Sequence, residues 1–240
     1  MISKKLMLLE MLGGAQIKPW YLSGGVAKIN CLAAYKPKGA ANLTESYINL
    51  ANPGTNDAAP GPVGAAPAWS ADHGWIFDGA TQTLTTGIVF AAGANQTSTM
   101  IVRFTDATAY ICGINNGGGV LWTISPTVSV TYRQYTSGNS NSVAGGNITA
   151  GIMALAGNNC YLNGATDGTL VSTSLDPGGQ PIIFGGTSWT YNACNIQALA
   201  IYNTVLTAAQ VLAISTAMAA GGGASMAGYG MGPLGLTYSS

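Results

Sequence analysis

The chain has 240 residues with eight Lys or Arg, eight Asp or Glu and one His, which gives a formal net charge of zero and only 7% charged residues. Soluble domains carry about 25% charged residues, so uncharged polar groups must cover most of this surface. The 48% hydrophobic fraction argues against a disordered chain, and zero net charge argues against nucleic-acid binding. Two glutamates, Glu10 and Glu45, are too few for a coiled coil, so composition favours a Gly-rich all-β domain with few acid–base groups.

The charges divide into two blocks along the chain. Residues 1–38 hold six lysines and one glutamate, a formal charge of +5, and the remainder holds two arginines and seven acids, a charge of −5. Such asymmetry is typical either of a docking arm that seeks an acidic partner surface or of a solvated leader, and both interpretations stay open. The predicted docking arm comprises residues 1–25, and its candidate contact residues are Lys4, Lys5, Lys18, Trp20 and Tyr21.

The N-terminus and the cysteines bear on the cellular compartment. Residues 1–15 resemble a signal peptide only superficially, because Glu10 interrupts the apolar segment and no small-residue cleavage motif follows. No run of about 18 strongly apolar residues indicates a membrane span. Two disulfides are possible in a secreted protein, but a chain of this length can bury a core without them, so we favour four reduced, buried thiols. The cysteines are Cys31, Cys112, Cys160 and Cys194.

Short strands are predicted along most of the chain. A buried strand over residues 26–35 is followed by a Lys-Pro-Lys-Gly turn, and residues 51–68 form a Pro/Gly-rich loop that excludes a helix or a central strand. Further segments rich in Val, Ile, Thr and aromatic residues, bounded by turn residues, indicate a sandwich or barrel rather than alternating strands and helices. They are 74–77, 82–86, 97–105, 109–113, 120–124, 128–135, 148–156, 160–162, 170–173, 182–185 and 194–202. In one of them, Met100, Val102 and Phe104 share one face.

One helix is predicted near the C-terminus, over residues 208–220. Thr207 is its candidate N-cap, and Val211, Ile214 and Met218 form its apolar stripe. Residues 221–240 are a Gly-rich tail whose composition predicts no fixed structure by itself. If the tail and the N-terminal arm are held in place, neighbouring subunits are the candidates for holding them.

Five motifs in chain order resemble the strands of one known family. They are Gly-Trp-Ile-Phe-Asp-Gly-Ala at 74–80 with Leu-Thr-Thr-Gly at 84–87, the strand at 99–104, the Asn-Gly hairpin at 156–164, Pro-Ile-Ile-Phe-Gly-Gly at 181–186, and the strand plus helix at 194–211. Over residues 26–220 the chain therefore resembles concanavalin A-like, laminin-G-like jelly-roll domains. Three further motifs resemble virion-associated proteins of tailed phages and prophages: Trp-Tyr-Leu-Ser-Gly-Gly at 20–25, Ala-Tyr-Lys-Pro-Lys-Gly-Ala at 34–40 and Asn-Leu-Ala-Asn-Pro-Gly-Thr at 49–55.

The resemblance implies a fold and two alternative functions. The expected fold is an all-β, concanavalin A-like jelly-roll sandwich with one C-terminal helix and extended N- and C-terminal arms. The first function is that of a non-enzymatic phage virion protein, a head decoration or a tail or fibre component, which forms homo-oligomers and contacts other virion proteins. The alternative is a carbohydrate-binding module or adhesin, secreted or on a cell surface, that recognises host glycans.

The sequence lacks the residues of the enzymes known in this fold. Some jelly-roll relatives hydrolyse polysaccharides with paired carboxylates in an E-x-D-x-x-E strand, whereas the acids here are isolated in loops. His73 is the only histidine, so neither a His-rich metal site nor a relay with a second base can form, and we interpret it as a turn residue. We predict that the protein is not an enzyme.

Two kinds of binding site remain. Laminin-G-like relatives sometimes bind Ca²⁺ through a loop aspartate, which makes Asp78, Asp106 and Asp167 candidates, although such sites need several converging oxygens; no other cofactor is expected. Sugars stack on exposed aromatic rings, and the candidates near Asn/Ser/Gly-rich loops are Trp122, Tyr132, Tyr135, Trp189 and Tyr191. These rings could instead pack between loops or against a neighbouring subunit. We assign Trp75, Phe77, Phe104, Phe184 and Tyr202 to the core.

Overall fold

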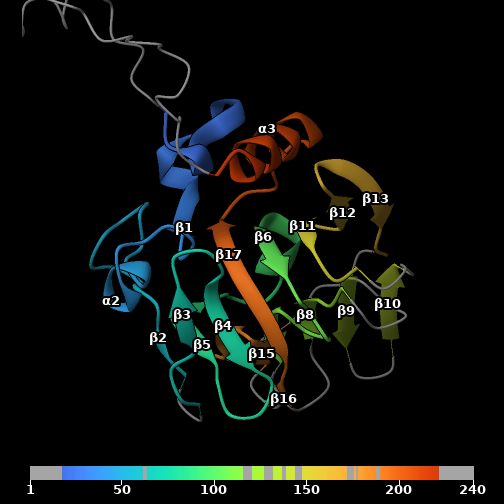
Figure 1. Cartoon of the computed structure of the whole chain (residues 1–240). Helices are drawn as coiled ribbons and strands as arrows, with labels where there is room; N and C mark the ends of the chain where they lie inside the picture. The colour runs from blue at the N-terminus through green and yellow to red at the C-terminus, as the bar shows by residue number, and fades with distance from the viewer. Residues whose placement is uncertain are drawn as a thin grey trace, which may run out of the picture.

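The computed structural model describes residues 18–61, 64–115, 121–126, 132–136, 139–143, 148–171, 176, 178–187 and 190–221. Two antiparallel sheets pack face to face, and helix α3 (Ala208–Ala219) lies at one end of the molecule, against the outer side of one sheet (Figure 1). The predicted fold class, an all-β sandwich with one C-terminal helix, is confirmed. Of the predicted arm, residues 1–17 lie outside the described residues, as does the predicted tail beyond Gly221.

The two sheets have eight and seven strands. Sheet 1 runs in the order β13 (Ala165–Thr169), β12 (Asn159–Leu162), β11 (Gly151–Ala156), β6 (Thr99–Thr105), β17 (Ala193–Tyr202), β4 (Gly74–Asp78) and β3 (Ala68–Ser70), and β1 (Cys31–Tyr35) also pairs with β17. Sheet 2 runs β10 (Asn139–Val143), β9 (Tyr132–Thr136), β8 (Leu121–Ile124), β7 (Cys112–Asn115), β14 (Pro181–Phe184), β5 (Leu84–Val89) and β2 (Ala59–Pro60). The short elements are β15 (Gly186–Thr187), β16 (Thr190–Tyr191), η1 (Trp20–Gly25), η2 (Lys28–Asn30), α2 (Leu43–Ser46) and η3 (Ala94–Thr97).

The strand predictions fail mainly at the edges of the sheets. The strand expected from residue 26 begins only at Cys31, because Lys28–Asn30 forms a 3₁₀ turn. The strand predicted at 170–173 does not form at Leu170 and Val171. The strands that were not predicted are β2, β3, β10, β13, β15 and β16, and of these β10 and β13 lie at one edge of sheet 2 and of sheet 1 respectively, with β2 and β3 at the opposite edges. The sequences of β10 and β13, Asn-Ser-Asn-Ser-Val and Ala-Thr-Asp-Gly-Thr, lack the apolar alternation of a half-buried strand. Polar sequences are common at sheet edges, where they discourage pairing with another chain.

The main core lies between the two sheets. Met100, Val102 and Phe104 of β6 all face into it, as their alternation predicts. Trp75 from sheet 1 stacks on Phe184 from sheet 2, with ring centroids 6.0 Å apart and an interplanar angle of 16°. The five aromatic residues assigned to the core are all buried: Trp75, Phe77, Phe104, Phe184 and Tyr202.

A second core lies on the outer face of sheet 1, between the sheet and the pair η1 and α3. The sheet contributes small residues such as Ala154, Ala198 and Ala200, and the helical elements contribute larger side chains above them. Because these alanines leave room above the strands, the rings of Trp20 and Tyr21 can pack against the sheet, and both are nearly fully buried. The remaining members of this core are Leu22, Val26, Cys31, Ala34, Ala51, Ile101, Ile152, Ala156, Tyr161, Tyr202, Leu206, Val211, Ile214 and Met218.

The second core corrects the predicted N-terminal arm. Trp20 and Tyr21 were predicted to contact a partner, but they are buried inside this chain. The Tyr202 hydroxyl donates to the Tyr21 carbonyl at 2.9 Å, and the Tyr21 hydroxyl donates to the Leu50 carbonyl at 2.8 Å. The predicted boundary at residue 25 is therefore wrong for Trp20–Gly25, which belong to the body. Lys18 is exposed, and Lys4 and Lys5 lie outside the described residues.

Glycine explains part of the Trp-Tyr-Leu-Ser-Gly-Gly motif. Gly24 has a φ of +70°, and a Cβ placed on it would lie 2.9 Å from Cα of Gln210 in α3. Only glycine allows this backbone conformation and this close approach without strain. The motif therefore fits η1 against α3.

Helix α3 forms as predicted and is capped at both ends. The Thr207 side chain accepts from the backbone N–H of Gln210, and the Gln210 side chain accepts from the N–H of Thr207, which makes a capping box. The predicted stripe Val211, Ile214 and Met218 is buried. At the other end, Nη1 of Arg103 donates to the carbonyls of Met218 and Ala219, the second at 3.2 Å. A cation at this end is favoured by the helix dipole. None of the described helices has the length and apolar character needed to cross a membrane.

All four cysteines are buried free thiols. Burial raises the pKa of Cys31 and of Cys160 to about 12, and it raises the pKa of Cys112 and Cys194 as well. At pH 8 the thiolate, which is the reactive form, is therefore scarce in the folded protein.

We expect the native protein at pH 8 to react very slowly with an aromatic disulfide reagent such as DTNB. The same protein in denaturant, without reductant, should release one chromophore for each of the four thiols. Rapid reaction of the folded protein, or fewer than four thiols after denaturation of freshly purified protein, would show that the thiols are accessible or oxidised.

Candidate functional site

The structure corrects two of the predicted sugar-stacking residues. Trp122 is only 1% exposed and Tyr132 is fully buried. Trp122 packs edge-on against Phe90 at 5.4 Å between ring centroids, and the Tyr132 hydroxyl donates to the Tyr161 carbonyl at 2.5 Å. Both residues face the main core, because the inward positions of β8 and β9 fall on them. Neither ring can stack on a sugar.

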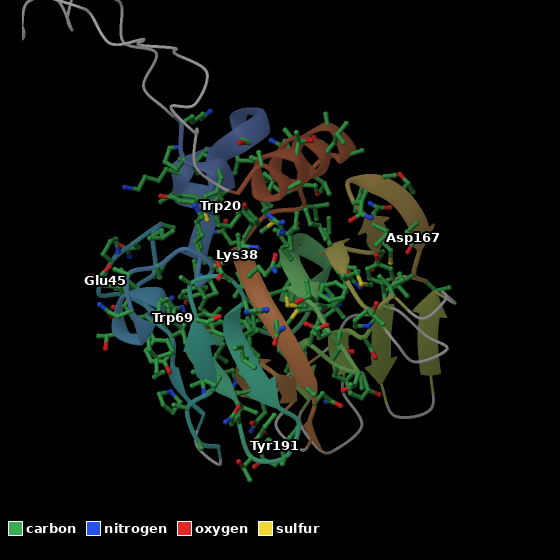
Figure 2. The ribbon with its side chains drawn as sticks, viewed as in Figure 1. Trp20, Lys38, Glu45, Trp69, Asp167 and Tyr191 are labelled. Carbon is green, nitrogen blue, oxygen red and sulfur yellow. The ribbon has the colours of Figure 1, made fainter. Side chains whose placement is uncertain are left out.

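Of the other three predicted sugar-stacking residues, the structure describes the side chain of Tyr191 alone. Tyr191 is half-buried on β16, in the hairpin at the end of the molecule opposite α3 (Figure 2). Tyr135 pairs with Leu121 in the backbone register of β8 and β9, but its side chain lies outside the described residues, as does all of Trp189. Tyr191 therefore remains a candidate, and the other two stay predictions.

The three aspartates proposed for Ca²⁺ have separate local roles. The Asp78 carboxylate accepts from the N–H groups of Ala80 at 2.8 Å and Thr81 at 3.1 Å, and these bonds lower its pKa. Asp106 accepts from Nδ2 of Asn195 at 2.6 Å. Asp167, on β13, is half-buried, and its charge adds to burial in raising the pKa of the Tyr132 hydroxyl.

These aspartates do not form one site. Across the described residues, no group of three or more His, Cys, Asp or Glu side chains comes together in a way that could hold a metal ion. Their carboxylates instead stabilise a turn, a strand end and a buried hydroxyl. His73 lies in a turn, as predicted, with Nδ1 3.1 Å from Oγ of Ser70 and its backbone N–H donating to the same oxygen.

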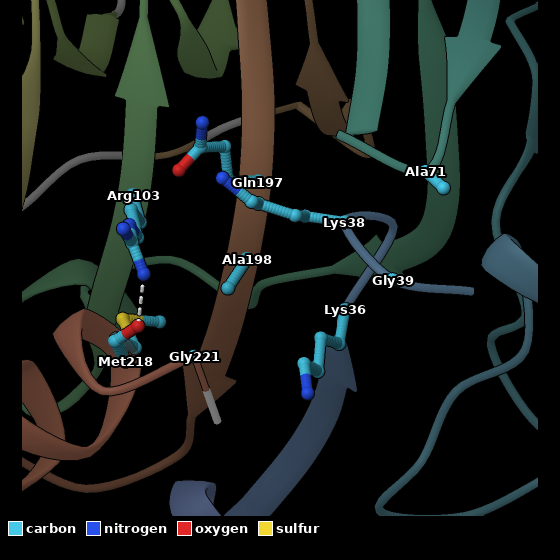
Figure 3. A pocket seen from close by; sticks show the side chains of 9 residues that line it. All are labelled: Lys36, Lys38, Gly39, Ala71, Arg103, Gln197, Ala198, Met218 and Gly221. Carbon is cyan, nitrogen blue, oxygen red and sulfur yellow. Dashed lines mark hydrogen bonds between the residues drawn. The ribbon is translucent and has the colours of Figure 1, made fainter. Parts of the chain in front are cut away.

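A pocket on the outer side of sheet 1 gathers much of the positive charge of the protein. It has a volume of about 200 Å³ and contains Lys36, Lys38 and Arg103, together with the amide side chain of Gln197 (Figure 3). We call it the basic pocket. Its other lining residues are Gly39, Ala71, Ala198, Met218 and Gly221. It lies beside the C-terminal end of α3, where the helix no longer covers the sheet.

The Lys-Pro-Lys-Gly turn places both lysines at the pocket. The N–H of Lys38 donates to the Gln197 carbonyl at 3.2 Å, and the N–H of Gly39, at a φ of +82°, donates to the Ala71 carbonyl at 2.8 Å. The indole N–H of Trp69 donates to the Pro37 carbonyl at 2.8 Å. Three hydrogen bonds thus attach three consecutive residues, 37–39, to β17 and to the segment around β3. Pro37 is buried, and the lysine on each side of it extends into the pocket.

A β-bulge at Gln197 opens the space that the turn occupies. On one edge of β17, residues up to Ile196 pair with β4, and residues from Leu199 onward pair with β1. On the other edge, the register with β6 shifts between Ile196 and Ala198. Bulges re-aim side chains and interrupt pairing, often beside functional sites. Here the bulge leaves Gln197 and Ala198 between two neighbouring strands, at the wall of the pocket.

The electrostatics of the pocket are those of partly buried cations. Burial lowers the pKa of Lys36 and of Arg103. In Figure 3, the Arg103 guanidinium points to the end of α3 and the Lys38 side chain reaches toward Gln197. Burial of a cation without a carboxylate beside it is unfavourable, so an anionic ligand in this pocket would be stabilised.

The residues of this pocket are visible in the sequence as isolated charges, but the sequence does not show that they meet in one site. The block of positive charge in residues 1–38 was a signal, and it was assigned to an arm. Arg103 lies far along the chain, and its position beside the two lysines depends on the pairing of β6 with β17. No spacing in the sequence indicates that pairing.

A second hollow, of about 530 Å³, lies beside β1. One wall is formed by Ala51, Asn52, Thr55 and Asn56, within the Asn-Leu-Ala-Asn-Pro-Gly-Thr motif and the residue after it. The opposite wall is formed by Lys28, Ile29, Cys31 and Leu32. Among the described residues, Lys28 is the one charged residue that lines this hollow, whereas three charged residues line the basic pocket, so the hollow has fewer groups that could bind a charged ligand.

Comparison with known proteins supports the fold. No family model and no curated protein matches the chain. Among solved structures, domain 4 of AbnA, a GH43 extracellular arabinanase from Geobacillus stearothermophilus solved in complex with arabinotriose, matches with a TM-score of 0.56 and 14% identity. The match covers 78% of this chain and 98% of that domain.

Two other matches cover only part of larger proteins. Trypanosoma rangeli sialidase matches with a TM-score of 0.51 and 13% identity, over 80% of this chain and 33% of the sialidase. The binding domain of botulinum neurotoxin DC, in complex with rat synaptotagmin II, matches with a TM-score of 0.51 and 10% identity, over 80% of this chain and 52% of that domain. At such low identities the likeness is one of fold, and it agrees with the predicted lectin-like jelly-roll sandwich.

Proposed function

We propose that this protein is a non-catalytic carbohydrate-binding domain, secreted or displayed on a cell surface. The observation that carries the proposal is the match to domain 4 of the arabinanase, which extends over 98% of that domain and concerns a structure solved with arabinotriose. A match to a whole compact domain, rather than to a fragment of a larger architecture, supports a shared type of function. That domain belongs to an extracellular enzyme, which supports the placement outside the cell.

The basic pocket supplies suitable chemistry for a sugar. Sugars are recognised by a few polar groups beside apolar surface, and here Lys36, Lys38 and Gln197 provide the polar groups while the exposed Ala71 side chain is apolar. A volume of about 200 Å³ is below the roughly 300–1,000 Å³ of pockets for drug-sized molecules. The pocket therefore suits one sugar unit at the end or in the side chain of a glycan.

The prediction of a structural role in a phage particle stays a prediction. None of the similar structures described above is a virion protein, and the segments assigned to particle docking, residues 1–17 and 222–240, lie outside the described residues. A virion protein could also bind carbohydrate, so the two hypotheses are compatible. The experiment below therefore tests whether the protein binds a glycan and not where it is located.

A broad glycan array that includes arabino-oligosaccharides tests this proposal. We expect the full chain to bind at least one class of glycan saturably, and titration calorimetry with the best soluble oligosaccharide should confirm binding. The control is the same protein after thermal unfolding. Folded protein that shows no saturable binding to any class of glycan would overturn the proposal.

A further inference from the structure

We infer that the basic pocket selects an acidic sugar, one whose ring bears a carboxylate or a sulfate. This inference rests on the proposed function and specifies its ligand. The requirement is a negative group small enough to enter a pocket of about 200 Å³ together with part of a sugar ring.

Positive charge is concentrated at the basic pocket. The chain has eight Lys and Arg residues in all, and three of them line this one pocket. The described part of the chain records no ion pair between these three residues and a carboxylate. Asp72 and His73 follow the lining residue Ala71 in the same turn, but both are exposed and neither lines the pocket. A ligand anion would therefore neutralise charge that the described part of the chain leaves without a carboxylate partner.

The backbone beside the two lysines is held in place, and so is the guanidinium of Arg103. The turn that bears Lys36 and Lys38 is fixed by three hydrogen bonds to β17 and to the β3 region. Arg103 is fixed by its bonds to the end of α3, and both of these bonds use Nη1. Guanidinium has five N–H donors, so those on Nε and Nη2 are not used by these two bonds. Preorganised donors reduce the entropy lost on binding.

The lining of the pocket suits an anionic group that is carried by a sugar ring. A free inorganic anion would need only the cations, whereas this pocket combines them with the Gln197 amide and the exposed apolar side chain of Ala71. The amide can bond to a ring hydroxyl, and the apolar surface can contact the carbon face of a sugar. Nucleic acid is a poor fit, because a strand would require a charged track along the surface rather than one small pocket. An acidic sugar can use the cations, the amide and the apolar surface together.

The test compares pairs of oligosaccharides that differ only in charge. Oligogalacturonate is paired with its methyl ester, which is neutral, and sulfated galactan oligomers are paired with unsulfated ones. We expect the protein to bind at least one acidic member about tenfold or more tightly than its neutral partner. Binding should weaken at an ionic strength of about 1 M, where charges are screened beyond about 3 Å. The carboxylate and sulfate pairs identify which anion is preferred.

Two matched double variants test whether the preference for acidic oligomers arises in the basic pocket. The double variant Lys36→Gln/Lys38→Gln keeps polar side chains and removes two charges from the pocket, and we expect it to lose about tenfold or more in affinity for the acidic oligomer. The control is Lys18→Gln/Lys28→Gln, which makes the same change of net charge outside the pocket and should change affinity less than about twofold. Lys38→Gln alone serves if the double variant is unstable, and Arg103 is left intact because it caps α3.

The outcomes separate the two proposals. Equal affinity for acidic and neutral oligomers would overturn the acidic-sugar inference and leave the carbohydrate-binding proposal standing. An equal loss in the control variant would also overturn the inference, because the effect would then come from the overall charge of the surface. A lack of binding to any glycan would overturn both.

Discussion

Replacement of Trp20 by alanine is expected to lower the free energy of unfolding by about 3–5 kcal/mol. Trp20 is 5% exposed and packs edge-on against Tyr21, with ring centroids 5.6 Å apart, in the layer between sheet 1 and α3. Removal of its ring leaves a cavity in this layer, which the packed elements around it can fill only in part. Its indole N–H has no hydrogen-bond partner in the described part of the chain, so the loss is one of packing.

Urea denaturation followed by far-UV circular dichroism measures this change without relying on tryptophan fluorescence. The control is Ile29→Ala, in the neighbouring 3₁₀ turn, whose side chain is 82% exposed and whose loss should change stability by no more than about 0.5 kcal/mol. If Trp20→Ala were as stable as this control, the second core would contribute nothing to folding.

The same reasoning changes the expected result of truncation. If residues 1–25 formed a docking arm outside the body, as predicted from the sequence, removal of residues 1–22 would leave a folded body. The structure places Trp20, Tyr21 and Leu22 in the second core, so this truncation should destabilise the protein at least as much as Trp20→Ala does. A deletion meant to probe docking by the N-terminal arm should therefore end before Trp20.

Replacement of Asn49 by alanine is also expected to lower the free energy of unfolding by about 3–5 kcal/mol. Asn49 is fully buried, and its side chain makes four hydrogen bonds to backbone groups. Its Oδ1 accepts from Ala34 and Ala51, both at 3.0 Å, and its Nδ2 donates to Leu32 at 3.0 Å and Thr55 at 2.8 Å. Alanine would leave these buried groups without partners, and each such group costs about 1–3 kcal/mol.

The control for this variant lies in the same loop. Asn52 is exposed, so Asn52→Ala should change the free energy of unfolding by no more than about 0.5 kcal/mol. Asn49→Asp tests the hydrogen-bond pattern itself, because it keeps the shape and the acceptor but removes both donors. We expect Asn49→Asp to be destabilised as well, and a stable Asn49→Asp variant would contradict the assigned role of Nδ2.

The three motifs that resemble phage virion proteins all have structural roles around β1. Trp20–Gly25 packs under α3, the Lys-Pro-Lys-Gly turn forms a wall of the basic pocket, and Asn49 attaches the following loop to β1. Two of these roles, burial and loop anchoring, would be needed whatever the protein binds. Such motifs report how this part of the sandwich is built, and they do not by themselves identify where the protein acts.

Much of the fold was determined by features local in the sequence. The apolar alternation of β6, the N-cap at Thr207 and the stripe on α3 are encoded within a few residues, and each appears as predicted. The low charge and the scarcity of glutamate likewise fit a polar, uncharged sandwich surface. Local patterns succeed here because strand alternation and helix capping depend on neighbouring residues.

The candidate site was decided by tertiary structure. The bulge at Gln197 reverses the alternation of β17, so that Cys194 and Ile196 face the main core before it and Leu199 and Ile201 face the same core after it. That one extra residue opens the wall of the basic pocket, and the pairing of β6 with β17 brings Arg103 to the lysines that follow β1. Burial of Trp122 and Tyr132 depended in the same way on which face of sheet 2 meets sheet 1.

The tertiary structure gives the uneven charge distribution of the chain a more specific meaning. The sequence by itself determined that charge is scarce and that most positive charge lies near the N-terminus. Only the tertiary structure decided that part of this charge lines a pocket of the body and that Trp20 and Tyr21 belong to a core. The physical reason is that a pocket is made by residues distant in sequence, whose meeting depends on strand register and on which surfaces each side chain must bury.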